Sequence, residues 1–252
     1  MRKIILFLLL LGSLRLTAQY SGSMYVAAKT GLSMRDKPDA GAKVLDKIPY
    51  GTKITIIRSE EELKSIVTEG IEGYWQKVKY NNKTGYILDS YLFPWAPPKL
   101  VTVKEMKNYF AQLTVPFGAK LIVKSGTMNN IEDGGWQLDK QLYKNGAEWH
   151  QFHGYEYGSN TYFLPDFTLQ QGFLLLRLIP EFNQLFGEKD EFPTKTTTVK
   201  KGEVEYLIRV DKWQEDSPFI QKIHIEFSPD ASYIFDMYIQ DNQLVIFYGS
   251  GV

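Results

Sequence analysis

Cysteine is absent from this 252-residue sequence, and its absence excludes several classes of protein. Without cysteine there are no disulfides, so each domain depends on its hydrophobic core for stability. We expect no diacylglyceryl-cysteine anchor, and a hydrolase with a Cys–His pair is excluded because the nucleophile is missing. The sequence also lacks a G-x-S-x-G elbow, an S-x-x-K motif and a glycine-rich phosphate loop.

An excess of charge of either sign is missing as well. The chain has 29 basic and 29 acidic residues, so its formal net charge is zero. This balance provides no overall attraction to nucleic acid or to anionic membranes, and we expect no nucleic-acid partner. Aromatic residues make up 14% of the chain, a content more typical of β-rich structure than of a helical bundle.

No hydrophobic run is long enough to cross a bilayer. The longest N-terminal run, Ile4 to Leu11, is far shorter than the roughly 20 residues that a spanning helix needs. It follows Arg2 and Lys3 and precedes a small residue at a plausible cleavage site, Ala18, which is the pattern of a secretory signal peptide. We predict a signal peptide over residues 1–18 and a mature chain that is secreted or periplasmic, without a membrane anchor after cleavage. The alternative is an N-terminal helix that the folded protein retains.

Residues 19–93 are rich in strand and turn signals. In GLSMRDKPD (31–39), Leu32 and Met34 alternate with polar residues, and a Pro-containing turn follows. The β-branched run KITII (53–57) and the segments YWQKVKY (74–80) and NNKTG (81–85) continue the pattern. The charged stretch between them (58–73) predicts either a hairpin through residues 65–71 or a short helix capped by Ser59 with Glu62.

The order of these segments resembles the bacterial SH3 (SH3b) family. The elements that carry the resemblance are Leu32–Met34–Arg35, Gly51–Thr52–Lys53, Trp75 to Val78, Asn82 to Tyr86 and Ser90–Tyr91–Leu92. The resemblance covers about 70 residues, and the long charged stretch before Trp75 departs from the tighter loop of many members. It implies an all-β SH3-like barrel that engages peptidoglycan or a peptide or protein partner.

Beyond this unit the chain predicts a Pro-rich linker and a second domain. The linker, residues 94–99, carries three prolines and should be extended. Residues 100–252 predict an α+β domain, an antiparallel β-meander with one or two helices. The expected elements are helices over 103–113 and from Thr168, a hairpin around Asn145–Gly146, a strand over 119–125, and strands over 203–213, 219–227, 232–240 and 243–250.

No residues form a recognisable catalytic or metal constellation. Glu148 and His150 share one face of a predicted strand and His153 points to the other, which makes a poor metal triad. His224 alternates with isoleucines and predicts a solvent-facing or cross-strand role. We therefore predict no catalytic residues, no metal site and no cofactor.

Aromatic side chains give the candidate binding site. SH3-like domains carry a shallow groove of aromatic rings, and the candidates are Tyr50, Trp75, Tyr86 and Tyr91. Val78 lies three residues after Trp75 and is expected in the core, on the opposite face of a regular strand. Lys53, Lys77 and Lys83 would favour an acidic peptide in the groove.

Three functional hypotheses follow. The first is a non-enzymatic extracytoplasmic protein whose SH3b domain binds cell-wall peptide, peptidoglycan or a protein partner. The second is a cell-envelope hydrolase with its catalytic site in residues 100–252, targeted by the SH3b domain. In the third, the SH3b unit is purely structural and its groove is covered by the linker or the second domain.

Overall fold

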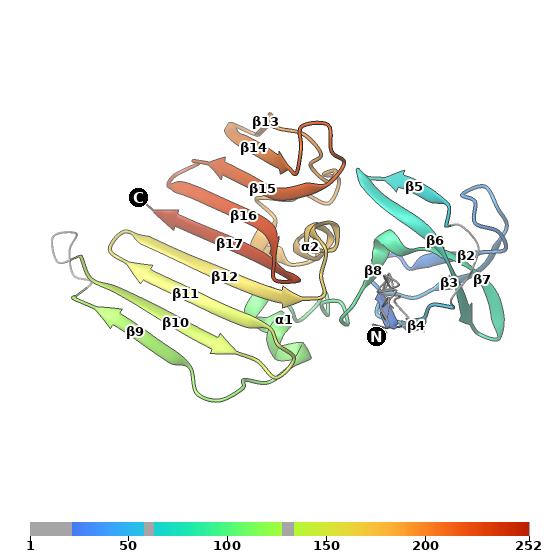
Figure 1. Ribbon diagram of the computed structural model, residues 1–252, viewed down its shortest axis with the longest axis horizontal. Coiled ribbons are helices and arrows are strands. Elements are labelled where there is room, and N and C mark those ends of the chain that lie inside the picture. Colours follow the sequence, from blue (N-terminus) through green and yellow to red (C-terminus); the bar gives the residue numbers. More distant parts are fainter. Residues whose placement is uncertain (1–21, 58–62, 128–133, 252) are drawn as a thin grey trace, which may run out of the picture.

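The structure is a computed structural model that describes residues 22–57, 63–127 and 134–251. The predicted signal peptide and the Ser59–Glu62 capping pair lie outside these residues. The described chain is mostly β and has two parts, shown side by side in Figure 1. We call residues 22–93 the N-terminal unit and residues 100–251 the C-terminal unit.

The described residues of the N-terminal unit form eight short strands and one 3₁₀ turn. These are β1 (Ser23–Val26), β2 (Leu32–Arg35), β3 (Val44–Ile48), β4 (Lys53–Thr55), β5 (Ser65–Thr68), β6 (Ile71–Tyr80), β7 (Lys83–Leu88), η1 (Asp89–Tyr91) and β8 (Leu92–Phe93). They form two sheets, ordered β4-β1-β8 and β3-β2-β7-β6-β5, rather than the single closed ladder expected of a barrel. Both sheets contribute to one core, in which Val26, Met34 and Val78 have no exposed surface.

The described part of the charged stretch before Trp75 forms a β-hairpin through residues 65–71, as one of the two alternatives predicted. β5 pairs with β6 from Ser65 opposite Tyr74 to Thr68 opposite Ile71. The turn consists of Glu69 and Gly70, both at positive φ (55° and 74°). Glycine accepts this conformation without steric strain, which explains its place at the tip.

The C-terminal unit contains one nine-stranded antiparallel sheet. Its elements are α1 (Met106–Leu113), β9 (Leu121–Ser125), β10 (Trp136–Leu142), β11 (Glu148–Gly154), β12 (Tyr157–Pro165), α2 (Leu169–Leu176), η2 (Pro180–Phe182), β13 (Thr197–Lys201), β14 (Val204–Lys212), β15 (Ile220–Phe227), β16 (Ser232–Gln240) and β17 (Gln243–Gly251). The strand order is β13-β14-β15-β16-β17-β12-β11-β10-β9. Two meanders, β9–β12 and β13–β17, therefore join through the pairing of β12 with β17.

Helices form only a small part of this unit, which is β-rich rather than evenly α+β. Thr168 caps α2 through a capping box with Gln171, as the sequence predicted, and Pro180 opens the 3₁₀ turn beyond the helix. Phe173 and Leu176 of α2 are fully buried in a core that also includes Met237 and Ile246 of the sheet. This apolar packing holds α2 between the sheet and the N-terminal unit (Figure 1).

The linker is docked rather than free. Pro97 and Pro98 are buried, and Trp95 packs edge-on against Phe167, with 5.2 Å between ring centroids. The carbonyl oxygens of the segment accept hydrogen bonds from both units: Ala96 from the Tyr109 hydroxyl (3.0 Å), Pro97 from the Gln112 amide (3.0 Å) and Pro98 from the Tyr50 hydroxyl (2.7 Å).

Candidate functional site

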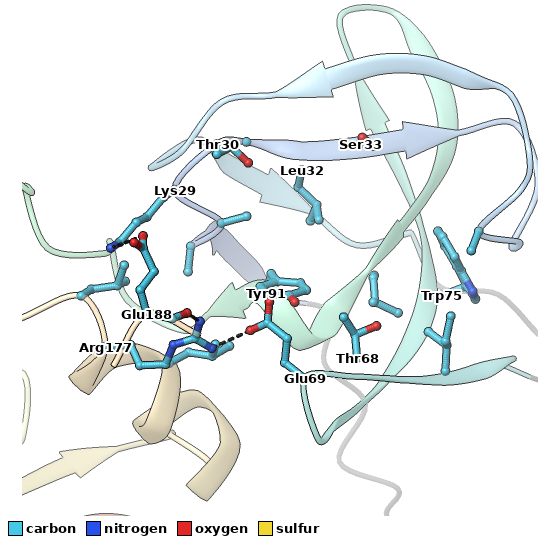
Figure 2. A pocket seen from close by; sticks show the side chains of 18 of the residues that line it. Lys29, Thr30, Leu32, Ser33, Thr68, Glu69, Trp75, Tyr91, Arg177 and Glu188 are labelled. Carbon is cyan, nitrogen blue, oxygen red and sulfur yellow. Dashed lines mark hydrogen bonds and ion pairs between the residues drawn. The ribbon is translucent and has the colours of Figure 1, made fainter. Parts of the chain in front are cut away.

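A cavity of about 480 Å³ lies in the N-terminal unit where it meets α2, and we call it the junction cavity. Strand β2 provides Leu32 and Ser33 and hairpin β5–β6 provides Thr68 and Trp75, while Arg177 closes one end from the C-terminal unit. Figure 2 shows these side chains extending from the charged end to Trp75 at the other. Cavities of this size and mixed lining can hold a small elongated ligand.

Trp75 lies on the same face of β6 as Ile71 and Gly73, and the burial pattern of the strand changes phase after it. Ile71, Gly73 and Trp75 are buried in strict alternation, but the next buried residue is Val78. Trp75 is only 7% exposed, so its ring forms the wall of a cavity instead of lying open in a shallow groove. Val78 is fully buried in the core, as predicted.

The four predicted aromatic residues do not form one site. Trp75 and Tyr91 line the junction cavity. Tyr50 is half-buried beneath the linker, where burial raises the pKa of its hydroxyl and the hydroxyl donates to Pro98. Tyr86 lies on β7, outside the cavity lining, with the Lys77 ammonium 5.9 Å from its ring centroid.

Charged side chains close the end of the cavity between the two units. The Arg177 guanidinium contacts the Glu69 carboxylate at 2.5 Å and also donates to the Glu188 carbonyl. Lys29 forms an ion pair with the Glu188 carboxylate at 3.0 Å (Figure 2). Burial is the main cause that raises the pKa of Tyr91 to about 12, and the nearby Glu69 carboxylate adds to it. Tyr91 is therefore a neutral hydrogen-bonding group at physiological pH.

Several of these residues could not be predicted from the sequence. Ser33, Thr68, Glu69, Arg177 and Glu188 carry no motif, and they come together where the tip of hairpin β5–β6 contacts Arg177, the C-cap residue of α2, and Phe192. The signal in the sequence that could have indicated this contact was the unusual length of the charged stretch before Trp75. The lysines proposed for an acidic ligand lie elsewhere, and Lys83, for example, pairs with Asp46 at 3.0 Å.

Two of the three histidines contact carboxylates within the sheet. His150 contacts Glu148 at 3.0 Å on β11, and burial lowers the pKa of its imidazole. His224 is a cross-strand partner of Asp236, with 2.7 Å between Nδ1 and Oδ1, which agrees with one of the two predicted roles. None of the three histidines lines the junction cavity. Within residues 22–57, 63–127 and 134–251, no group of three His, Cys, Asp or Glu side chains could hold a metal ion. Over the same residues no helix is long and apolar enough to cross a membrane.

Comparison with known proteins identifies one part of the chain. Residues 30–93 match the family model of the bacterial SH3 domain. The comparisons with curated proteins and with solved structures found no match. The matched segment contains β2 to β8 and most of the residues of the junction cavity. Residues 30–93 are therefore a bacterial SH3 domain, followed by a β-rich region that no comparison identifies.

Proposed function

We propose that this protein is an extracytoplasmic, non-enzymatic binding protein whose bacterial SH3 domain receives cell-wall peptide in the junction cavity. The observation that carries the proposal is the cavity itself, about 480 Å³, which lies where the SH3 domain meets α2 and is lined by Trp75 and Tyr91 of that domain. Aromatic rings provide apolar area with polar tips, which suits recognition of short peptides.

The lining fits a peptide in more detail. Leu32 and Leu88 offer apolar contacts for small aliphatic side chains. The hydroxyls of Ser33 and Thr68 can hydrogen-bond the peptide backbone. Arg177, held by the Glu69 carboxylate and the Glu188 carbonyl, closes the end of the cavity and limits the length of the peptide that fits. The secreted or periplasmic location follows from the predicted signal peptide and is part of the same proposal.

Binding is tested by sedimentation of the mature chain with intact peptidoglycan. Thr68 is half-buried and lines the cavity, while its neighbour Val67 is 66% exposed and points away from it. Thr68→Trp places a large ring in the cavity, and Val67→Trp adds the same ring to the outer face of β5. This pair avoids Trp75→Ala, which removes a buried ring and destabilises the fold.

We expect the unmodified chain and Val67→Trp to sediment with peptidoglycan and Thr68→Trp to remain in the supernatant. Equal sedimentation of the two tryptophan variants shows that the junction cavity is not the binding site. If the unmodified chain stays in the supernatant, cell-wall binding is refuted.

A further inference from the structure

A second hollow lies on the opposite face of β6 from the junction cavity. Side chains of a strand alternate between its two faces, so Glu72 and Tyr74 point away from the side that carries Ile71 and Trp75. They border a cavity of about 930 Å³ and a smaller one of about 250 Å³, which share Glu72, Tyr74, Thr168 and Gln170. We call the two together the acidic groove.

Apolar side chains form much of this groove and remain open to solvent. Phe219 is 75% exposed, Ile239 44% and Tyr74 39%. They come from both units, Tyr74 from the SH3 domain and the others from the C-terminal unit. Exposed apolar surface gathered in a cavity is a common feature of sites that bind another molecule.

Among the residues that the structure describes, every charged residue that lines the groove is acidic. Glu72, Asp89 and Asp166 belong to the lining, and within residues 22–57, 63–127 and 134–251 no lysine, arginine or histidine lines it. The Asp89 carboxylate accepts hydrogen bonds from the Tyr74 backbone N–H (2.7 Å) and the Gln76 amide (2.9 Å), neither of which carries a positive charge. Burial raises the pKa of Asp89, and the nearby charge of Glu72 is the main cause that raises the pKa of Tyr74.

We infer that the acidic groove binds a peptide segment of a protein partner in which lysine or arginine stands next to aromatic or aliphatic side chains. The apolar side chains of the peptide bury against Phe219 and Ile239, and its lysine or arginine lies near Glu72 and Asp89. An aromatic ring such as Tyr74 also attracts a cation placed over its face. This site is separate from the junction cavity and does not depend on the proposed cell-wall binding.

Isothermal titration of the mature chain with two matched peptides tests the inference. The probes are acetyl-Phe-Lys-Phe-Lys-amide and acetyl-Phe-Glu-Phe-Glu-amide, which differ only in the sign of their charge. We expect the basic peptide to bind more tightly than the acidic one and to lose affinity as salt is raised. Absence of binding by the basic peptide at millimolar concentration, or equal affinities for the two peptides, overturns the inference.

Two groove variants and two control variants locate the binding. Glu72→Gln should weaken the basic peptide about threefold, because an exposed charge pair is worth under about 1 kcal/mol. Phe219→Ala should weaken it about tenfold through lost apolar contact. Glu203→Gln is the control, since Glu203 is exposed in the β13–β14 turn, outside the groove lining. Unchanged affinity in both groove variants overturns the inference. Thr68→Trp should leave this affinity intact, which separates the groove from the junction cavity.

Discussion

Replacing Gly70 with alanine tests whether hairpin β5–β6 anchors the SH3 domain to the C-terminal unit. Gly70 has φ of +74° at the tip of the hairpin. A Cβ atom at this position would lie 2.7 Å from the carbonyl oxygen and 3.1 Å from the nitrogen of Phe192. Both are backbone atoms, so they cannot move aside as a flexible side chain could. The methyl group must therefore push the hairpin away from Phe192.

The expected cost has two parts. An L-residue in the left-handed region costs about 1–2 kcal/mol. Displacement of the tip also breaks the hydrogen bond from Phe192 N–H to the Glu69 carbonyl (2.8 Å), worth about 1 kcal/mol, and strains the contact of Glu69 with Arg177. Gly70→Ala should lower the free energy of unfolding by about 2–4 kcal/mol in total.

Gly51→Ala is the matched control in the same domain. Gly51 has a similar φ of +77°, but a Cβ atom there meets nothing within 4 Å. This variant should lose only the conformational part, about 1–2 kcal/mol. Urea denaturation of the full chain, followed by tryptophan fluorescence and circular dichroism, gives both free energies. If Gly70→Ala is no less stable than Gly51→Ala, contact with Phe192 does not anchor the hairpin.

Three further predictions concern the junction and the sheet. Residues 94–99 should resist limited proteolysis in the native chain, because the linker carbonyls are hydrogen-bonded; rapid cleavage there contradicts the docked linker. Gln171→Ala should lower the free energy of unfolding by about 1–3 kcal/mol, because Gln171 both caps α2 and donates to the Leu92 carbonyl at 2.8 Å. Gln170→Ala is its control in urea denaturation, and equal losses contradict this role. Burial holds the pKa of His150 below its usual 6.5, so stability should fall as pH drops from 6.5 through the folded-state pKa. His150→Gln should flatten this part of a stability–pH curve, and an unchanged slope refutes the assignment.

Local patterns were sufficient to predict many of the elements. The alternation of Leu32 with Met34, the Asn145–Gly146 turn and the Thr168–Gln171 capping box each act over a few residues, and the structure contains β2, the β10–β11 hairpin and α2 at these places. Strand β12 was not predicted, since Gly158, Ser159 and Asn160 are poor strand formers. Its pairing with β11 and β17 on both sides overrides that local preference.

The candidate site was predictable only in part, because it depends on contacts between distant segments. Trp75 and Tyr91 could be named from the SH3 resemblance. Arg177 lies 108 residues from its partner Glu69, and no periodicity in the sequence indicates their pairing. Tyr50 was predicted to lie in the same groove, but its hydroxyl donates a hydrogen bond to the Pro98 carbonyl of the linker instead. The type of each side chain could be read from the sequence. Which distant segment packs over that side chain could be found only from the tertiary structure.

The docking of hairpin β5–β6 connects the two proposed sites. Strand β6 supplies Trp75 to the junction cavity on one face and Tyr74 to the acidic groove on the other. Each site also contains residues of the C-terminal unit, Arg177 in the first and Phe219 in the second. A variant that displaces the hairpin should therefore weaken both binding activities together. Gly70→Ala should reduce both peptidoglycan sedimentation and titration by the basic peptide, whereas Gly51→Ala should preserve both. If Gly70→Ala reduces only one of them, the sites do not share the docked hairpin as their common support.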